Sequence, residues 1–213
     1  MDVPANAGQA QIPRFVARPC QIEATGLSPP RFDNRLSGHW LPNCPLAAAS
    51  KRCLLTRVSR PYEEIIEGGT LPRCAPGERH EKICARLHQE MATSINGLAA
   101  LQLLAPRAQV QVARTTTLCP DLALITAATG KLFLAVEVVS RDDHRADTVT
   151  KKEIYEQLRL PRLWMVDPRY DNVETYHAFE FGLQLKEILA GSEILQEKLV
   201  PQFNMIVTDL FAP

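Results

Sequence analysis

Long apolar runs are missing from the 213-residue sequence, and none approaches the ~18 residues that a membrane-spanning helix requires. The stretch LFLAVEVV, residues 132–139, is typical of the longest ones. We also expect no secretory signal segment, because the N-terminus MDVPANAGQA has an acidic residue at position 2 and no apolar region. We therefore expect no membrane partner and a cytoplasmic location.

A cysteine-rich metal motif is also missing. The six cysteines form no CxxC pair, and we find no paired Cys/His spacing, whereas a structural zinc site needs ligands that short loops bring together. We therefore predict no zinc site and expect reduced thiols, as is usual in the cytoplasm. The cysteines occupy positions 20, 44, 53, 74, 84 and 119.

The net charge is zero over the whole chain but is divided unevenly. Residues 1–60 have eight Lys or Arg against three Asp or Glu, and residues 61–213 have sixteen against twenty-one. Seven prolines interrupt any helix in the first region, because proline lacks an amide donor and clashes with the preceding turn. We predict a disordered, basic extension over 1–60 and a folded domain over 61–213. A folded subdomain and a nucleic-acid-binding arm are the alternatives for the extension.

Apolar periodicity indicates mixed secondary structure in the second region. A short strand is predicted before the Gly68-Gly69 turn, and apolar residues at helical spacing predict a helix over 79–98. We expect an α+β fold of the three-layer α/β/α kind, with a mixed, mostly antiparallel sheet flanked by helices. Further strands are predicted over 109–113, 121–127, 131–139, 162–166, 173–177 and 183–188, and a second helix over 148–158.

Two carboxylates are predicted to face each other across a hairpin. Ala128-Thr129-Gly130 forms a three-residue loop with glycine at the left-handed position. Counting back from this loop places Asp121 opposite Glu137, with Cβ atoms about 4.5–5.5 Å apart. Two carboxylates at this separation repel each other unless a cation lies between them or one stays protonated. Mg²⁺ or Mn²⁺, which prefer oxygen ligands, would suit this pair.

Glu137 needs a partner for a second reason. It interrupts a strand that is apolar on both faces, and such a strand is expected at the centre of a sheet. Burying an unpaired carboxylate there is costly. A salt bridge to an arginine such as Arg145 is the alternative to a metal ion.

Lys151 is the third candidate for the site. In the helix over 148–158 it shares a face with Tyr155 and Leu158, which directs it toward the core, whereas Lys152 is rotated toward solvent. A lysine beside paired carboxylates can orient the attacking water and stabilise the negative charge that develops on a phosphate. The alternative is a lysine that extends along the helix flank to reach solvent.

The linked motifs resemble a known family. They match the Uma-type family of bacterial restriction endonucleases, a branch of the PD-(D/E)xK nuclease superfamily with a restriction endonuclease-like fold. The resemblance covers about residues 61–213. The motifs are YEEIIEGG, GERHEKICARL, CPD ending at Asp121, EVVS from Glu137, DxxxKxxxY from Asp147, LWMVDP, EILAGSEIL and LVPQFNMIVTDLF.

The resemblance implies a role for each motif residue. Metal ligands, a catalytic lysine and two residues that line the site are all expected. By this resemblance the ligands would be Asp121, Glu137 and the carbonyl of Val138, the catalytic lysine Lys151, and the lining residues Glu64 and His80.

One position departs from the superfamily pattern. Residue 139 lies on the same strand face as Glu137, where the superfamily places its lysine, but this sequence has Val139. Members that resemble this branch supply the lysine from the following helix, as Lys151 would.

Three of the motif residues also have ordinary structural explanations. His80 would, without the resemblance, be a core-edge histidine bonded to a backbone carbonyl. Glu64, beside Glu63, would be a solvated charge on an edge strand. Asp147 is explained equally well as a helix N-cap, with Thr150 as the other candidate cap.

These features predict a metal-dependent DNA endonuclease that hydrolyses phosphodiester bonds with bound Mg²⁺ or Mn²⁺. The acidic excess over 61–213 is a poor match for DNA, although basic residues gather within 141–162. A nuclease-fold protein that binds nucleic acid or a protein partner without cutting is therefore the alternative. A homodimer is left open.

Overall fold

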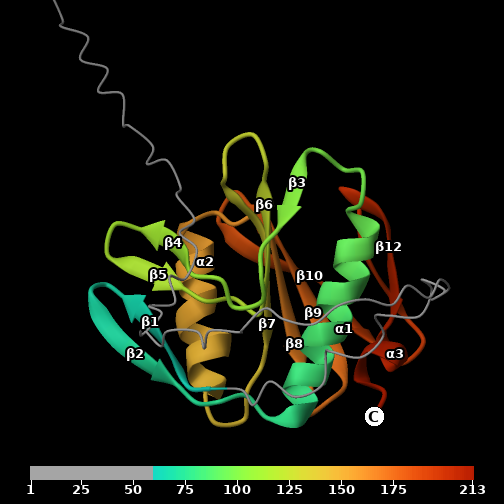
Figure 1. Ribbon diagram of the computed structural model, residues 1–213, viewed down its shortest axis with the longest axis horizontal. Coiled ribbons are helices and arrows are strands. Elements are labelled where there is room, and N and C mark those ends of the chain that lie inside the picture. The colour runs from blue at the N-terminus through green and yellow to red at the C-terminus, as the bar shows by residue number, and fades with distance from the viewer. Residues whose placement is uncertain (1–59) are drawn as a thin grey trace, which may run out of the picture. The chain divides into compact units, whose positions relative to one another are not determined.

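Residues 60–213 are the part of the chain that the computed structural model describes (Figure 1). The predicted extension over 1–60 therefore lies outside the described residues, apart from Arg60. The strands are β1 (Tyr62–Ile66), β2 (Gly69–Arg73), β3 (Leu101–Leu103), β4 (Val110–Ala113), β5 (Thr116–Leu118), β6 (Leu122–Thr126), β7 (Leu132–Val138), β8 (Arg162–Asp167), β9 (Asn172–Phe179), β10 (Gly182–Ala190), β11 (Ile194–Glu197) and β12 (Val200–Ile206). The helices are α1 (Glu78–Ser94), α2 (Lys152–Gln157) and α3 (Val207–Phe211), with a π-helical segment η1 (Ala146–Lys151) leading directly into α2.

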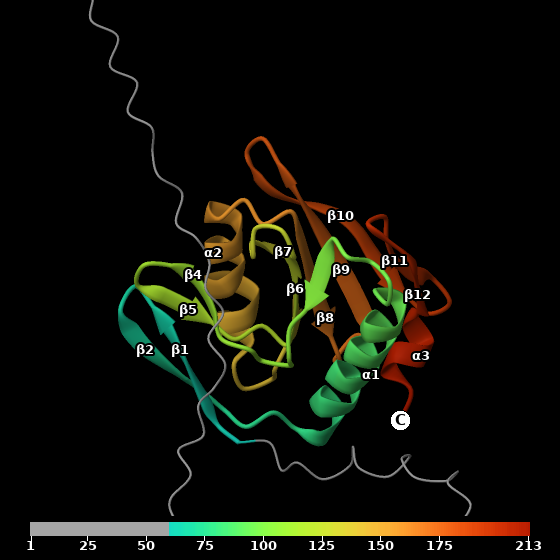
Figure 2. The same ribbon diagram turned by 45° about the horizontal axis from the view of Figure 1, so that its top comes forward.

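The central sheet has six strands in the order β10-β9-β8-β7-β6-β3. Every neighbouring pair is antiparallel except β7 and β8, which are parallel. Parallel neighbours need a crossover connection, and here η1 and α2 supply it. Figures 1 and 2 show α1 and α2 on opposite faces of this sheet. The predicted α+β fold, a mostly antiparallel sheet flanked by helices, is confirmed.

The six-stranded sheet separates two apolar cores. Successive residues of a strand point to opposite faces, so Leu122 and Leu124 of β6 contribute to one core and Ala123 to the other. The first core contains Leu87 of α1, and the second contains Tyr155 of α2. Near the end of β7, neighbouring residues therefore point alternately toward α1 and toward α2.

A second, four-stranded sheet packs on the α2 side. Its order is β2-β1-β5-β4, and all its neighbouring pairs are antiparallel. Val110, Val112 and Leu118 from β4 and β5 share the core of Tyr155. This packing brings β1 next to the crossover segment. On the other side, the β11–β12 hairpin adds Phe203 to the core of α1, where its ring lies 5.4 Å from that of Trp164.

The β6–β7 hairpin has the predicted register near the site but a different loop. The amide of Thr126 donates to the carbonyl of Lys131, so the loop is one residue longer than predicted. A β-bulge then leaves Phe133 without a partner. Between the bulge and the start of β6, from Leu124 back to Leu122, the pairing is the predicted one. Leu122 pairs with Val136. Asp121, one residue earlier, therefore lies beside Glu137 as predicted.

The crossover helix begins earlier than predicted. Helical structure starts at Ala146, and its first turn is a π-helix rather than an α-helix. Arg145 precedes this turn without a side-chain cap, so the prediction that Asp147 or Thr150 caps the helix is wrong. Asp147 lies inside the first turn and is buried.

Among residues 60–213 no helix combines the length and the apolar composition of a membrane span. The longest, α1, has 17 residues, and its exposed side carries charged residues such as Glu78 and Lys82.

Candidate active site

Four carboxylates and one lysine are buried where β7 ends and η1 begins. Their positions come from three places in the fold, namely β1, the β6–β7 hairpin and the crossover segment. Charged groups are seldom buried unless they are paired, so each needs a partner. They are Glu64, Asp121, Glu137, Asp147 and Lys151.

Lys151 lies at the centre of this group. Its side chain has 0% exposure, and its ammonium group lies 2.6 Å from Oε2 of Glu137 and 3.0 Å from Oε1 of Glu64. Burial alone would lower the pKa of Lys151, but the charges of Glu137 and Glu64 raise it. The lysine is therefore charged. The prediction that it faces the core is confirmed, and the alternative of a lysine extending into solvent is wrong.

Glu137 uses both carboxylate oxygens. Oε2 accepts from Lys151, and Oε1 accepts from the hydroxyl of Tyr155 at 2.5 Å. Burial raises the pKa of Glu137 to about 8, with Asp121 and Glu64 adding to the effect while Lys151 opposes it. The alternative partner, Arg145, is not involved, because its side chain is exposed and Lys151 takes the place foreseen for it.

Asp121 has a different set of neighbours. Its Oδ2 accepts the backbone amide of Val138 at 2.9 Å, and its Oδ1 lies 2.9 Å from Nε2 of His80 and 3.3 Å from Nε of Arg107. Burial would raise the pKa of Asp121, but the hydrogen bond and charge of His80 and the charge of Lys151 lower it to about 2. Asp121 is therefore the firmly ionised carboxylate of the site.

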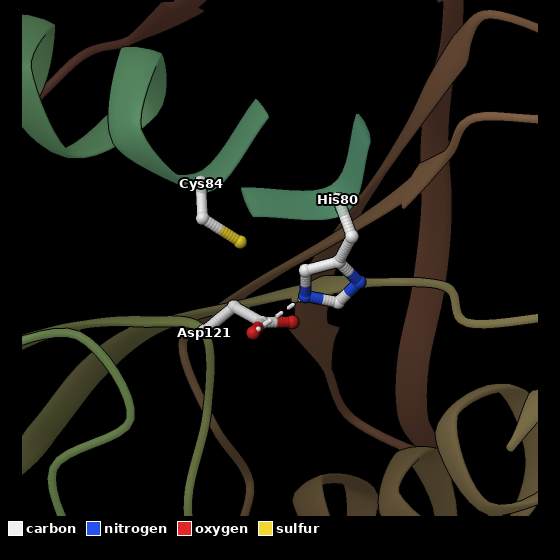
Figure 3. A group of neighbouring side chains, drawn as sticks. All are labelled: His80, Cys84 and Asp121. Carbon is white, nitrogen blue, oxygen red and sulfur yellow. Dashed lines mark hydrogen bonds and ion pairs between the residues drawn. The ribbon is translucent and has the colours of Figure 1, made fainter. Parts of the chain in front are cut away.

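His80 approaches Asp121 from α1, as Figure 3 shows. Because the partner is a carboxylate, the Nε2–H of the imidazole is the donor in their 2.9 Å hydrogen bond. The prediction without the family resemblance, a histidine bonded to a backbone carbonyl, is wrong for His80. His88, two turns later, makes such a bond to the carbonyl of Leu104.

Glu64 is buried in the site rather than solvated. Only 1% of its surface is exposed, so the expectation of an edge-strand charge in water is wrong. Oε1 accepts the backbone amide of Cys119 at 2.7 Å, in addition to its contact with Lys151. Oε2 lies 3.5 Å from Nη1 of Arg73 but accepts no hydrogen bond. Glu64 thus belongs to the buried cluster around Lys151, and its role in an active site stays a prediction.

The buried pair Arg73 and Asp147 was not foreseen. The guanidinium of Arg73 donates to Oδ1 of Asp147, whose Oδ2 accepts the backbone amide of Ser140 at 3.1 Å. The sequence carried a signal for Arg73, because the β1–β2 register extended from the Gly68-Gly69 turn pairs Arg73 with Tyr62. That register places Arg73 on the same face as Glu64.

Cys84 is a second residue that sequence reasoning missed. His80, Cys84 and Asp121 each offer a ligand atom, and these atoms lie within 4.8 Å of one another (Figure 3). The prediction that excluded zinc found no paired Cys/His spacing, and it overlooked the pair His80 and Cys84. The available signal was the spacing of His80 and Cys84, which are four residues apart on a helix and therefore share a face.

The donor set fits a hard divalent cation. The hairpin register brings Asp121 and Glu137 next to each other, and the negative charge of Asp121 raises the pKa of Glu137. Carboxylates of this kind are the protein ligands that Mg²⁺ prefers. Oε2 of Glu64 is a further buried oxygen that accepts no hydrogen bond.

The basic cluster expected within 141–162 is only partly at the site. Lys151 is buried in it, but Arg162 lies at the other end of β8, where it pairs with Leu134 of β7 and binds Glu197 at 3.2 Å. Lys152 is partly buried and lies 3.9 Å from the ring centroid of Tyr176, so it is less solvated than predicted. These residues supply little of a continuous DNA-binding surface.

The fold is similar to that of a protein of known structure. A crystal structure described as "a putative nuclease belonging to DUF820", from Anabaena variabilis, is similar with a TM-score of 0.60 and 13% sequence identity. The similarity covers 74% of this chain and 93% of that one. The profile of the family Uma2, described as "Putative restriction endonuclease", matches residues 59–208, and the chain belongs to this family. The resemblance seen in the motifs is thereby confirmed. No curated protein matches the chain.

Proposed function

We propose that the protein is a metal-dependent endonuclease that hydrolyses phosphodiester bonds in DNA. Asp121 and Glu137 would hold Mg²⁺ or Mn²⁺, with the carbonyl of Val138 as a further ligand. The observation that carries the proposal is the hairpin register, which places the buried carboxyl groups of Asp121 and Glu137 next to each other, with Lys151 2.6 Å from Glu137. When bound, the ion would polarise a phosphate oxygen and lower the pKa of a water ligand.

Lys151 would act on the phosphate rather than on the ion. Its ammonium group has three donors, and two of its neighbours, Glu137 and Glu64, hold it at the site. A fixed positive charge in a water-poor site stabilises negative charge that develops on phosphate oxygens, and a positioned donor orients an attacking water. The hydroxyl of Tyr155 would keep Glu137 in its orientation, and His80 would do the same for Asp121.

The position of Lys151 on η1 rather than on β7 supports the catalytic role that the family resemblance implies for it. Val139 is buried in the same core as Tyr155 and offers no charged group. Lys151 reaches Glu137 from the crossover segment instead. The catalytic lysine would therefore have moved from the strand to the following helix while its ammonium group stayed beside the same glutamate.

The proposal is tested by plasmid nicking. Purified protein would be incubated with supercoiled plasmid and Mg²⁺ or Mn²⁺, beside Asp121→Asn, Glu137→Gln and Lys151→Ala. Glu153→Gln is a matched control, because Glu153 is an exposed carboxylate two residues from Lys151. Nicking by the wild type and the control alone is expected. Equal nicking by all five proteins would mean a contaminating nuclease.

The second candidate is a nuclease-fold protein that binds nucleic acid or a protein partner without cutting. Val139 in the usual lysine position and the acidic excess over 61–213 favour it. Calorimetry with Mn²⁺ and an electrophoretic binding assay separate the two functions. Metal binding together with DNA binding but no nicking would support the second. A cytoplasmic location and a homodimer stay predictions.

A further inference from the structure

His80 and Cys84 are presented by α1 to the same space as Asp121. They lie four residues apart within the first two turns of α1, so both side chains point the same way. Asp121 directly precedes β6, and its side chain approaches them from the side of the sheet, as Figure 3 shows. The imidazole and the carboxylate are in contact at 2.9 Å, and all three potential ligand atoms lie within 4.8 Å of one another.

The three donors are of different chemical kinds. A thiol, an imidazole and a carboxylate are the ligand types that Zn²⁺ takes in proteins, whereas Mg²⁺ takes oxygen ligands and water. Three protein ligands leave a fourth position for water or another oxygen donor. The cluster therefore selects a different class of cation from the neighbouring pair of Asp121 and Glu137.

The geometry needs only a small adjustment to hold such an ion. Tetrahedral zinc with ordinary bond lengths separates its ligand atoms by about 3.3–3.6 Å. The imidazole and carboxylate would part slightly from 2.9 Å, and the sulfur of Cys84 would move inward from within 4.8 Å. Cys84 is buried with 5% exposure, and it lies in the core of α1, so its backbone is fixed.

Binding of a cation at this cluster would displace protons from its ligand atoms. The imidazole donates one proton to Asp121, and the thiol of Cys84 lies beside both groups. Binding of a cation would release the thiol proton to solvent and form the sulfur–metal bond. Nε2 of the imidazole would lose its proton, so that the ring keeps one proton on Nδ1 and Nε2 is free to act as a ligand. No electron transfer is required.

Arg107 is the group that opposes a cation here. Its Nε lies 3.3 Å from Oδ1 of Asp121, and its Nη2 donates to Glu81. Glu81 thus compensates the guanidinium locally, and 20% of the Arg107 side chain is exposed. A cation at Asp121 would have to displace this guanidinium, which keeps Glu81 as a partner.

We propose that His80, Cys84 and Asp121 form a binding site for a thiophilic divalent cation of the Zn²⁺ type, separate in chemistry from the oxygen-only site of Asp121 and Glu137. Because Asp121 belongs to both sites, the thiophilic ion would compete with Mg²⁺ and inhibit cleavage. The binding rests on the geometry alone, whereas the inhibition rests on the proposed function.

The binding is tested with Co²⁺ as a spectroscopic substitute for Zn²⁺. The full-length, reduced, metal-free protein is titrated with Co²⁺, and a thiolate-to-cobalt charge-transfer band is expected that saturates at one ion per chain and disappears when Zn²⁺ is added. Cys84→Ser should remove the band. Cys74→Ser, a change at an exposed free cysteine, should keep it. Absence of the band in the wild type, or its survival in Cys84→Ser, would overturn the proposal.

A second variant guards against a folding artefact. His80→Gln can still donate a hydrogen bond to Asp121, so it should fold, but its affinity for Co²⁺ should fall at least ~10-fold. Circular dichroism of each variant establishes that it is folded. An unchanged Co²⁺ affinity in folded His80→Gln would contradict the assigned ligand set.

Inhibition is measured at fixed Mg²⁺ as the rate of cleavage with Zn²⁺ divided by the rate without it, for each protein separately. The wild type should be inhibited at stoichiometric Zn²⁺, and Cys84→Ser should need a large excess. Equal inhibition of both would refute the competition. If the wild type does not cut DNA at all, the proposed function fails while the Co²⁺ result still decides the binding.

Discussion

The ammonium group of Lys151 donates to Oε2 of Glu137 across 2.6 Å, and neither side chain has more than 2% of its surface exposed. The same lysine also compensates Glu64. One buried ammonium group therefore contacts two buried carboxyl groups, and a change to any of the three alters both the stability of the domain and the charge of the site.

Lys151→Met should destabilise the metal-free protein strongly. Methionine fills a similar volume, but Glu64 loses its buried cation and Glu137 loses a hydrogen-bond donor, and breaking a buried ion pair from one side costs about 3–5 kcal/mol. The free energy of unfolding from urea titrations measures the effect. Lys152→Met is the matched control, because that side chain is only partly buried, and it should cost less than ~1 kcal/mol. Equal losses in the two variants would mean that Lys151 is not the compensating charge.

The free energy of unfolding of the wild type should fall relative to that of Glu137→Gln as the pH rises. The pKa of Glu137 is raised from 4.5 to about 8 in the folded protein. Its contribution to stability is therefore fully present below pH 4.5 and is lost as the pH rises through 8. Glutamine keeps an acceptor for Lys151 but has no proton to lose.

The pH effect is measured with EDTA present, so that no cation stabilises the carboxylate. Between pH 6 and pH 9 the wild type should lose roughly 1–3 kcal/mol relative to Glu137→Gln. Glu153→Gln, at an exposed position, should follow the wild type at every pH. Parallel stability curves for wild type and Glu137→Gln would show that Glu137 does not titrate in this range.

The hairpin shows how much of the site the sequence could reveal. The alternation of β6 and β7 and the glycine loop predict Asp121 beside Glu137, and the observed register agrees. Two deviations cancel on the way, since the longer loop shifts the pairing by one residue and the bulge at Phe133 restores it. Bulges depend on packing against other elements, so the agreement at the site end could not have been derived from the loop alone.

The burial of Glu64 and Asp147 could not be read from local sequence. Both are polar residues in short elements, where a strand edge or a helix cap is the ordinary expectation. Their environment arises only when the four-stranded sheet packs beside the crossover segment, which brings Arg73 to Asp147 and Lys151 to Glu64. Helical facing, by contrast, is a local property, and it predicted the inward direction of Lys151.

Mn²⁺ should stabilise the folded protein through Asp121 and Glu137. A ligand that binds only the folded state at a hundred times its Kd adds about 2.7 kcal/mol to the free energy of unfolding. Thermal melts with and without Mn²⁺ measure the shift in Tm. Asp121→Asn and Glu137→Gln should abolish the shift, and Glu153→Gln should retain it. A shift that persists in both site variants would place the metal elsewhere.

Tyr155→Phe should cost less stability with Mn²⁺ than without it. The hydroxyl of Tyr155 donates to Oε1 of Glu137 at 2.5 Å, and both side chains are buried, so the variant leaves a buried carboxylate oxygen without its donor. In the metal-free protein this should cost about 1–3 kcal/mol. A metal ion bound by Glu137 would partly compensate that oxygen, and the deficit should therefore shrink. Urea titrations of wild type and Tyr155→Phe, each with EDTA and with saturating Mn²⁺, give the four free energies of unfolding that are compared. If the deficit is the same in both conditions, Glu137 and the ion are not coupled, and the ligand role of Glu137 is wrong.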